Sequence, residues 1–439
     1  MNWSQYNILF KSDVHGCFLY NSRLNKFFSL SEDLYKTLKE IEFNPSKTST
    51  LLDKKLVEQL SSNKILVEKG EDYMYFNKML YLKRKRSFLG KELSLVIVPT
   101  MSCNFKCPYC YEHELSSGCM SEEVQDKLID FINKQQQKCD SLSIYWHGGE
   151  PLLAIETMKS LINKIKSSSK LPLKNQSMVS NGYLFNKDIC EFFKNYHIDY
   201  VQITVDGLRE THNVNRLHKS GVPTYDTIIN NIDLILNELP DTHVGVRMNI
   251  HQGNQNEYHL SYKELSKKWD GKNCSIYPAF VLPQGQKEGK CCTVPCLSPA
   301  QKANFYIDLH KKFNLGVDFM PKMQVGSCSA IYENHYVIDP KGLLYKCWAD
   351  IGIESRAVGD ISTGITKWDF VAAYSVGSDK FDDEKCRKCK IFPICDGGCN
   401  RFRVDYQLFG EKYDLCQIDN DGLVKYLEIL YEQQINEKK

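Results

Sequence analysis

The sequence predicts an α/β protein whose central part is a parallel sheet covered by helices. Apolar or β-branched runs of strand length recur along the chain, at residues 93–98, 142–146, 176–180, 200–205, 243–250 and 274–281. Between them lie segments with helical periodicity, for example residues 121–135 and 224–239. Strands that alternate with helices are typical of parallel sheets with helices on the outside.

Length and charge narrow the class of protein. The 439 residues suffice for two or three domains at roughly 100–200 residues each. The formal net charge of +2 gives no reason to expect nucleic acid or a membrane surface as a partner. The longest apolar runs are far shorter than the ~20 residues of a membrane span, and residues 1–10 lack the pattern of a signal peptide. We therefore expect a cytoplasmic protein without a nucleic-acid or membrane partner.

Cysteine is the most informative residue type, because 18 cysteines are too many for ordinary core positions. A reducing cytosol disfavours disulfides, so metal or cluster binding is the leading interpretation. Cys103, Cys107 and Cys110 follow the first strand in a C-x3-C-x2-C spacing. A structural zinc site normally has four ligands, whereas three thiolates on one loop suit a four-iron cluster with one open position. The alternative is a chance triplet in a cysteine-rich chain.

The second motif is the turn Gly148-Gly149-Glu150-Pro151, which ends the strand pattern within residues 141–154. Glycines let a backbone approach a ligand closely, and an exposed amide and carboxylate could hold an ammonium group. Taken alone, the motif could be a plain turn. Combined with the cysteine loop it resembles the radical SAM enzymes, and the resemblance continues through residues 178–185, 201–216 and 244–250. It implies a partial (β/α)6 barrel with its site at the carboxyl ends of the strands.

The radical SAM resemblance implies S-adenosylmethionine as a cofactor. In that family it chelates the open iron and is cleaved to a 5'-deoxyadenosyl radical, which abstracts hydrogen from an unactivated carbon. The residues that match the family's cofactor contacts are Gly148, Gly149 and Glu150 for the amine, Thr204 and Arg216 for the ribose and carboxylate, Ser180 and Asn181 at a neighbouring strand end, and Tyr109 near the adenine. For each, the alternative is a satisfied polar residue or a core aromatic.

One position departs from the family pattern. The family often has His-Asp where this chain has His212-Asn213, so no proton-transfer role is expected there. The residue that deprotonates the substrate is not identifiable from the sequence.

A second cysteine system occupies the C-terminal third. By residue type alone it suits zinc knuckles and iron–sulfur clusters equally. Its order and spacing resemble the seven-cysteine SPASM extension, which binds two auxiliary [4Fe-4S] clusters. The resemblance implies an outer cluster held by Cys386, Cys389, Cys395 and Cys416, and an inner cluster held by Cys328, Cys347 and Cys399. The fourth position of the inner cluster stays open between Cys291, Cys292, Cys296 and no protein ligand.

The N-terminal residues form a separate pattern. Residues 7–31 predict three short strands, Ser31 is a candidate helix N-cap, and residues 48–68 predict further helix and a last strand. Such a winged-helix pattern could read DNA, but its charge is mixed and no basic recognition helix stands out. It resembles the PqqD-like precursor-recognition element (RRE) of peptide-modifying enzymes. There a leader peptide adds a strand, here beside residues 26–29, and packs near residues 56–60.

These patterns divide the chain into four expected parts. They are a PqqD-like peptide-recognition domain at residues 1–82, a solvated basic linker at 83–91, a radical SAM partial barrel at 92–315 and a SPASM domain at 316–439. The expected function is radical crosslinking within a ribosomally made precursor peptide, first a carbon–carbon bond between lysine and tryptophan as in streptide-type cyclases. An electron donor such as flavodoxin or ferredoxin is an expected partner.

Three other functions compete with this one. A sulfur-to-carbon thioether is the runner-up bond. Formylglycine formation by a sulfatase maturase is disfavoured, because those relatives usually lack the recognition element. A non-enzymatic iron–sulfur electron carrier is also disfavoured, because it gains nothing from an open iron beside an amine-binding turn.

Overall fold

The computed structural model describes residues 1–112, 118–282, 294–316, 323, 325–326, 328–413, 415–416 and 420–436. The chain divides into two compact units, each assembled from separate segments. Unit 1 comprises Met1–Leu89, Pro299–Cys328 and Ala373–Lys439. Unit 2 comprises Gly90–Ser298 and Ser329–Ala372.

Unit 2 is built on a ten-stranded sheet with the order β11-β10-β9-β8-β7-β6-β12-β13-β14-β15. Its parallel strands include β6 (Glu92–Ile97), β7 (Ser141–Trp146), β8 (Leu173–Ser180), β9 (Tyr200–Thr204), β10 (His243–Ile250) and β11 (Cys274–Phe280). Each coincides with one of the predicted runs, so the predicted parallel sheet is confirmed. Parallel strands are typically buried on both faces, and Leu95, Ile144 and Ile203 are fully buried.

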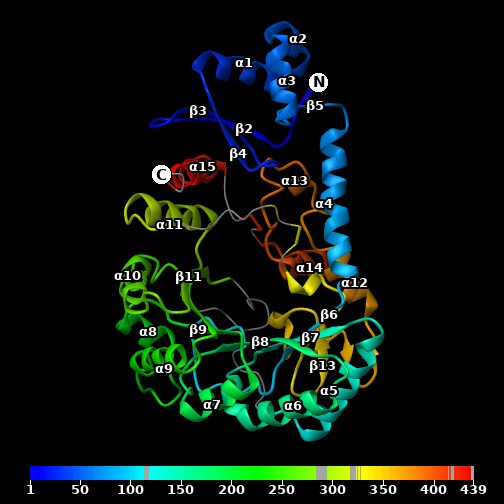
Figure 1. Ribbon diagram of the computed structural model, residues 1–439, viewed down its shortest axis with the longest axis vertical. Helices are drawn as coiled ribbons and strands as arrows, with labels where there is room; N and C mark the ends of the chain where they lie inside the picture. The colour runs from blue at the N-terminus through cyan, green and yellow to red at the C-terminus, as the bar shows by residue number, and fades with distance from the viewer. Residues whose placement is uncertain are drawn as a thin grey trace. The chain divides into compact units, whose positions relative to one another are not determined.

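Helices connect successive parallel strands and lie outside the sheet in Figure 1: α5 (Glu122–Lys134), α6 (Ile155–Ser168), α7 (Lys187–Tyr196), α8 (Arg209–Asn215), α9 (Tyr225–Glu238) and α10 (Tyr258–Lys268). In α5 the Ser121 side chain accepts a hydrogen bond from the Val124 amide, which caps the helix. Leu128 and Ile132 lie one turn apart on its buried side. Connections of this kind bring the carboxyl ends of the parallel strands to the same edge of the sheet.

The sheet continues beyond the predicted strands. β12 (His335–Ile338) pairs in parallel with β6, and the antiparallel strands β13 (Leu343–Tyr345), β14 (Gly359–Asp360) and β15 (Gly364–Ile365) follow it. Gly342 has a φ of +89° at the β12–β13 turn, a conformation that glycine adopts without strain. The extension places Cys347 and Trp348, which follow β13, in the same unit as the barrel strands.

Unit 1 contains the predicted N-terminal strands as an antiparallel sheet ordered β2-β3-β4, with β2 (Asn7–Ser12), β3 (Gly16–Asn21) and β4 (Lys26–Leu30). β1 (Asn2–Trp3) pairs separately with β5 (Leu66–Val67). Ser31 caps α1 (Glu32–Phe43) as predicted, because its side chain accepts a hydrogen bond from the Leu34 amide. Further helices with residues in unit 1 are α2 (Thr48–Leu51), α3 (Lys54–Ser62), α4 (Glu71–Phe88), α11 (Pro299–Lys311), α12 (Trp368–Val376), α13 (Glu384–Arg387), α14 (Asn400–Phe409) and α15 (Asn420–Asn436).

Strands β2 and β3 pack against a core on each face of the N-terminal sheet, since side chains alternate between the two faces along a strand. Leu9 and Leu19 belong to a core that they share with α1 and α3. Phe10 and Phe18 belong to a second core, which includes Leu427 of α15 and residues of the C-terminal cysteine region. The N-terminal strands and the C-terminal cysteine region therefore form one packed unit.

The expected solvated linker at residues 83–91 is wrong for most of its length, because α4 continues to Phe88. The sequence of α4 has no glycine or proline, with acidic residues in the first turn and basic residues in the last. Such a sequence favours a helix. Lys83 is 2% exposed, donates a hydrogen bond to the Ser375 carbonyl at 2.8 Å and pairs with Asp379. A buried, paired lysine belongs to a packed helix and not to a tether.

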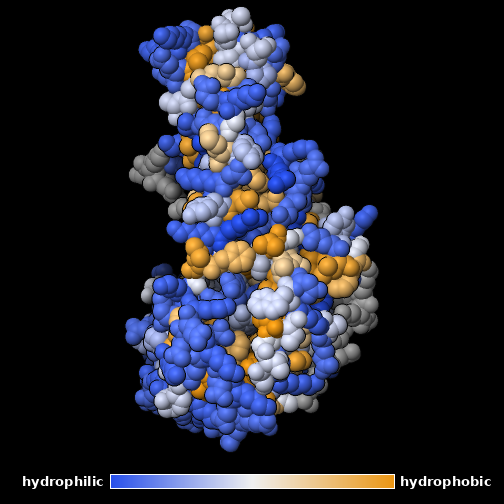
Figure 2. Space-filling view, turned by 90° about the vertical axis from the view of Figure 1, so that its right-hand side faces the viewer, coloured by the Kyte–Doolittle hydropathy of each residue, from blue (hydrophilic) through white to orange (hydrophobic). Residues whose placement is uncertain are grey.

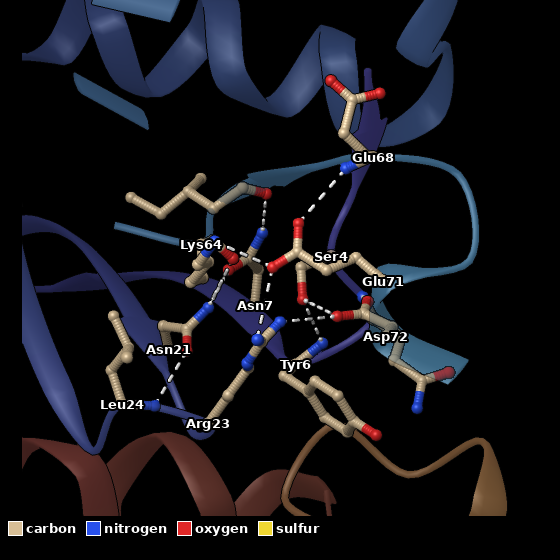
Figure 3. Close-up of polar contacts among 12 residues, drawn as sticks. Ser4, Tyr6, Asn7, Asn21, Arg23, Leu24, Lys64, Glu68, Glu71 and Asp72 are labelled. Atoms are coloured by element: carbon tan, nitrogen blue, oxygen red, sulfur yellow. Dashed lines mark hydrogen bonds and ion pairs between the residues drawn. The ribbon is translucent and has the colours of Figure 1, made fainter. Parts of the chain in front are cut away.

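A polar network joins the start of α4 to the N-terminal strands (Figure 3). Arg23 pairs with Glu71 at 3.2 Å and with Asp72 at 3.6 Å. The Ser4 hydroxyl donates to Asp72 Oδ1 at 3.1 Å, and Lys64 pairs with Glu71 at 2.9 Å. Because these contacts come from three separate segments between the strands and helices, they fix where α4 begins.

Hydrophilic residues cover most of the face that Figure 2 shows, with hydrophobic residues in small groups among them. Exposed apolar side chains of α4 include Met74 and Phe88. Among the described residues, no helix is both long and apolar enough to span a bilayer.

Candidate active site

The cysteine loop leaves the carboxyl end of β6 and carries Cys103, Cys107 and Cys110. Main-chain amides organise it, since the Phe105 amide donates to Cys103 Sγ at 3.4 Å and the Cys110 amide to the Cys107 carbonyl at 3.1 Å. Phe105 is buried, which anchors the middle of the loop. The loop therefore presents three thiols from one short, ordered segment.

The two glycines of the second motif pack against this loop. A Cβ at Gly148 would lie 2.4 Å from the Thr100 carbonyl oxygen, and one at Gly149 would lie 2.3 Å from the Ser102 carbonyl oxygen. The Glu150 amide then donates to the same Ser102 carbonyl at 2.8 Å. Only glycine fits so close to another main chain. The approach that we expected toward a ligand is made toward the cysteine loop, which joins the two motifs.

Glu150 is fully buried and turned toward the end of β8. Its carboxylate accepts hydrogen bonds from the Ser180 hydroxyl at 2.9 Å and the Asn181 amide at 2.7 Å. Burial raises the pKa of this carboxyl, and these hydrogen bonds oppose the shift. The Glu150 carboxylate therefore holds the end of β8 beside the glycine turn.

A cavity of about 410 Å³ opens at the carboxyl ends of the parallel strands. It is lined by the three cysteines of the loop and by Tyr109, Gly148, Gly149, Ser180, Asn181, Thr204 and Arg216. These are all the predicted cofactor residues except Glu150, which lies behind its partner Ser180. The volume suits a small cofactor, and the position is the one where barrels place their sites.

Asp206 is a site residue that the sequence analysis missed, although it lies two residues after strand β9 and precedes a glycine. It is fully buried and accepts a hydrogen bond from the Tyr109 hydroxyl, and its Oδ1 accepts one from the Asn249 amide at 2.9 Å. Arg216 Nη1 donates to the Tyr109 hydroxyl at 3.4 Å. Burial raises the pKa of Asp206, and the nearby Arg216 opposes the shift. This chain of contacts fixes the Tyr109 ring.

The His212-Asn213 pair has a structural role. Asn213 Oδ1 accepts hydrogen bonds from the amides of Thr224 and Tyr225 at 2.8 and 2.9 Å, at the start of α9. His212 is fully buried, and its Nδ1 accepts from the Asp206 amide at 3.1 Å. Burial lowers the pKa of His212 well below its ordinary value, so it stays neutral.

The donor set of the cavity fits the expected cofactors. Burial raises the pKa of the Cys103 thiol to about 11, and neighbouring Glu150 and Cys107 add to the shift. Coordination to iron removes this penalty, because a bound cation stabilises crowded thiolates. Among the described residues, no three His, Cys, Asp or Glu converge as they would on a single metal ion.

Arg216 fits the carboxylate of the second cofactor. It lines the cavity, its guanidinium lies 5.4 Å from the centre of the Phe105 ring, and its Nε is buried without a hydrogen-bond partner among the described residues. A buried donor without a partner is costly. An anionic group in the cavity would satisfy it.

Other residues of the same cavity were also missed by the sequence analysis. They are Tyr111, Glu112, His147, Gln202, Arg247, Asn249, Phe280, Val281, Leu282 and Trp348. Tyr111 and Glu112 directly follow the cysteine motif and His147 directly precedes the glycine turn, so adjacency to a motif could have indicated them. Trp348 comes from the loop after β13, and no local signal pointed to it.

The cysteines predicted for the outer auxiliary cluster lie in unit 1. The Cys389 thiol lies close enough to the thiols of Cys386 and Cys416 to interact with them electrostatically. The Cys395 thiol interacts with that of Cys389 in the same way. Arg403 Nη2 donates to Cys386 Sγ at 3.3 Å and to the Gly397 carbonyl at 2.6 Å. These contacts bring the four thiols into one neighbourhood, and their ligation stays a prediction.

The inner auxiliary set also stays a prediction. Cys328 and Cys399 belong to unit 1, whereas Cys347 belongs to unit 2. Of the three candidate fourth ligands, Cys296 lies in unit 2, and Cys291 and Cys292 lie outside the described residues.

Comparison with known sequences gives a family match for the central region. The sequence model of the radical SAM superfamily matches residues 97–262. The chain is 24% identical over 349 residues to a cysteine-type anaerobic sulfatase-maturating enzyme of Clostridium perfringens, covering 71% of this chain and 90% of that protein. It is 29% identical over 364 residues to a serine-type anaerobic sulfatase-maturating enzyme of Bacteroides thetaiotaomicron, covering 73% of this chain and 86% of that protein.

Solved structures share the fold. A histidine-tagged form of anSMEcpe with bound AdoMet superposes with a TM-score of 0.59 at 21% identity, covering 79% of this chain and 94% of that chain. Streptococcus suis SuiB bound to S-adenosylmethionine superposes with a TM-score of 0.53 at 15% identity, covering 96% of this chain and 99% of that chain. The family implies S-adenosylmethionine and a [4Fe-4S] cluster as cofactors. Residues 97–262, which hold the cysteine loop, the glycine turn and most of the cavity, match the radical SAM superfamily.

Proposed function

We propose that this chain is a radical SAM/SPASM maturase that installs an intramolecular crosslink in a ribosomally made precursor peptide. The observation that carries the proposal is the fold likeness to S. suis SuiB, which extends over 96% of this chain and so includes the N-terminal module. SuiB has also been solved bound to the precursor peptide SuiA. The specific product that we propose is a lysine–tryptophan carbon–carbon bond, with a thioether as the alternative bond.

The cavity residues support the radical chemistry. Cys103, Cys107 and Cys110 would hold a [4Fe-4S] cluster, which with bound S-adenosylmethionine supplies one electron and a radical able to abstract hydrogen. Arg216 would bind the cofactor's carboxylate through its unpartnered Nε. Tyr109, fixed by Asp206, would form a wall for the adenine.

The N-terminal module supports recognition of a leader peptide. β4 lies at one edge of the β2-β3-β4 sheet and, among the described strands, pairs only with β3. An extended peptide can add a strand at such an edge through main-chain hydrogen bonds. Phe28 of β4 packs on the same core as Leu56 and Val57 of α3, and all three are only partly buried. Their remaining surface offers apolar contacts to leader side chains.

The C-terminal cysteines would hold two auxiliary clusters. The outer set would be Cys386, Cys389, Cys395 and Cys416, and the inner set would include Cys328, Cys347 and Cys399. Auxiliary clusters supply one-electron acceptors, which an oxidative crosslink needs because closing the bond releases one electron beyond the hydrogen atom first removed. A flavodoxin or ferredoxin is the proposed source of the initiating electron.

Formylglycine formation on a protein cysteine or serine is the second candidate. It is favoured by the two sulfatase-maturating relatives, which match 71% and 73% of this chain. The wider fold likeness to SuiB weighs against it, because that superposition extends over 96% of this chain, whereas the one with anSMEcpe extends over 79%.

Mass spectrometry of two substrates distinguishes these functions. The reconstituted enzyme is incubated without oxygen with S-adenosylmethionine, a reductant and either the peptide encoded beside its gene or a cysteine-containing sulfatase peptide. Crosslinking removes two hydrogen atoms from the encoded peptide and suppresses fragmentation between the joined residues. Formylglycine formation creates an aldehyde that a hydrazine probe captures. Aldehyde in the sulfatase peptide, with the encoded peptide unchanged, would transfer the assignment to the second candidate.

A further inference from the structure

Four cavity residues have no part in the cofactor site proposed above. Tyr111 and Glu112 follow the last cysteine of the loop, His147 precedes the glycine turn, and Trp348 follows Cys347. The Tyr111 hydroxyl lies within electrostatic range of the thiols of both Cys110 and Cys347. The four residues therefore form a wall between the cysteine loop and the segment after β13, within unit 2.

Glu112 is the unusual member of this wall. Its side chain is only 5% exposed, and its Oε1 has no hydrogen-bond partner among the described residues. A buried carboxylate oxygen without a donor is costly, so such an atom in a native protein calls for a partner. The partner must bring a hydrogen-bond donor or a positive charge.

His147 does not supply that donor in this arrangement. Its Nδ1 lies 3.3 Å from Glu112 Oε1, but the same nitrogen accepts a hydrogen bond from the Gly148 amide at 2.6 Å. One ring nitrogen cannot accept from Gly148 and donate to Glu112 at the same time. The other ring nitrogen, Nε2, lies 3.3 Å from the Tyr111 hydroxyl.

The cation in the same cavity does not supply the donor either. Arg247 lines the cavity, and its Nε donates to Asn249 Oδ1 at 2.9 Å. Among the described residues, no ion pair joins Arg247 to Glu112. Within the described part of the chain, Glu112 Oε1 therefore has no donor, and a group bound in the cavity can supply one.

Trp348 adds the second feature of a cation site. Its ring stacks on His147 with centroids 5.7 Å apart and an interplanar angle of 23°. The residue is 47% exposed although it lines the cavity, so part of its ring is available for contact. Aromatic faces attract ammonium and guanidinium groups, most strongly where water is excluded.

We propose that Glu112, Tyr111 and Trp348 form a substrate subsite that receives a positively charged side chain, lysine or arginine, of the peptide. The cation donates to Glu112 Oε1, and its alkyl stem and charge lie against the Trp348 ring. This inference deepens the proposed function, because it names the side-chain chemistry that the site takes from its peptide substrate.

Binding of short probe peptides tests the subsite without turnover. The reconstituted full-length enzyme, saturated with S-adenosylmethionine, is titrated with N-acetyl-Gly-X-Gly amides in which X is lysine, arginine or norleucine, and dissociation constants are measured by ligand-observed NMR. We expect the lysine or arginine probe to bind about tenfold more tightly than the uncharged norleucine probe. The comparison of lysine with arginine shows which cation the subsite prefers.

Two variants locate the effect. Glu112→Gln is expected to reduce the preference to less than about twofold, while the affinity for S-adenosylmethionine and the iron content stay unchanged. Glu123→Gln, on the exposed face of α5, is the matched control and should keep the full preference. Should Glu112→Gln lose iron, Trp348→Leu decides, because it should weaken lysine or arginine binding several-fold and spare norleucine.

Equal affinity of the enzyme for all three probes would overturn the proposal. A tenfold loss of S-adenosylmethionine affinity in Glu112→Gln, with the peptide preference intact, would assign Glu112 to the cofactor instead. The proposed function fails separately, if the enzyme leaves its encoded peptide unmodified while the probe preference is present.

Discussion

The two cysteine regions of the chain provide very different surroundings for their thiols. In unit 2, Cys103, Cys107 and Cys110 line an open cavity of about 410 Å³ together with glycines, uncharged polar side chains and Arg216. In unit 1, basic side chains are packed against the cysteine segments, since Arg403 donates to Cys386 Sγ at 3.3 Å and Lys380 donates to the Cys395 carbonyl at 2.6 Å. Burial lowers the pKa of Lys380 to about 8, although neighbouring Cys395 raises it.

The difference agrees with the proposed separation of a catalytic cluster in unit 2 from an electron-transferring cluster in unit 1. A cluster that activates a cofactor needs free space beside it, which the glycine turn and the cavity supply. A cluster that only exchanges electrons needs its charge balanced by the protein, and buried cations do this. The following predictions test this contrast, from the largest expected effect to the smallest.

Replacing Cys103, Cys107 and Cys110 together by alanine has the largest expected effect. We expect loss of about a third of the bound iron and complete loss of 5'-deoxyadenosine formation, because these thiols line the cofactor cavity. Iron analysis and chromatography of the nucleoside measure both. Cys119→Ala removes an exposed thiol and should change neither. Nucleoside formation by the triple variant would refute the site.

Replacing Cys386 or Cys416 by alanine should separate the two regions. We expect 5'-deoxyadenosine to form at a rate near that of the parent, while crosslinked peptide falls steeply, because the proposed outer cluster acts after hydrogen abstraction. A paired assay of nucleoside and product mass tests this on a variant whose circular dichroism matches the parent, since metal binding and folding are coupled. Crosslinking at parental yield would rule out an electron-relay role.

Gly149→Ala tests whether the glycine turn must touch the cysteine loop. The added Cβ would lie 2.3 Å from the Ser102 carbonyl oxygen, so the loop has to shift. We expect a loss of about 1–3 kcal/mol in unfolding free energy and weaker binding of S-adenosylmethionine. Gly316→Ala, where no described residue lies within 4 Å, should stay within about 0.5 kcal/mol of the parent. Similar behaviour of the two variants would contradict the contact.

Arg403→Gln should change the proposed outer cluster without affecting the cavity. The substitution removes both the positive charge of Arg403 and its hydrogen bond to Cys386 Sγ. The reduction potential of the proposed outer cluster should therefore fall by on the order of tens of millivolts. A redox titration followed by electron paramagnetic resonance measures it. Arg387→Gln removes an exposed arginine whose guanidinium lies over the Phe76 ring, and should leave the potential unchanged. An equal shift in both variants would show a general charge effect.

Glu432→Gln should have the smallest effect. Burial works to raise the pKa of Glu432, but hydrogen bonds from His15 and His310 outweigh it and lower the pKa. A lowered pKa stabilises the folded state above the carboxyl's ordinary value of 4.5, and this contribution is lost as the pH falls. We expect the substitution to lower the free energy of unfolding by at most about 1 kcal/mol at pH 7 and by less below pH 4.5. Urea unfolding at a pH above and a pH below 4.5 measures this difference. A cost that does not change with pH would contradict the ion-pair explanation.

The parallel strands could be predicted because each is a local apolar run, and the same holds for the Ser31 cap. The packed helix at residues 83–88, where we expected a linker, could not be predicted in this way. Its basic residues suggested solvent, but Lys83 is buried beside Ser375 and Asp379, which are distant in sequence. The extension of the sheet by β12 was missed as well, because its pairing with β6 joins segments more than two hundred residues apart.

The sequence by itself determined the cysteine spacing, the glycine turn and the order of strands and helices, because each of these depends on neighbouring residues. From these follow the resemblance to the radical SAM enzymes and the edge of the sheet that holds the site. Only the tertiary structure decided that Glu150 turns to Ser180, that Asp206 holds Tyr109, and that Trp348 lies on His147. Such contacts depend on which strand ends and loops meet in space, and no local pattern encodes that meeting.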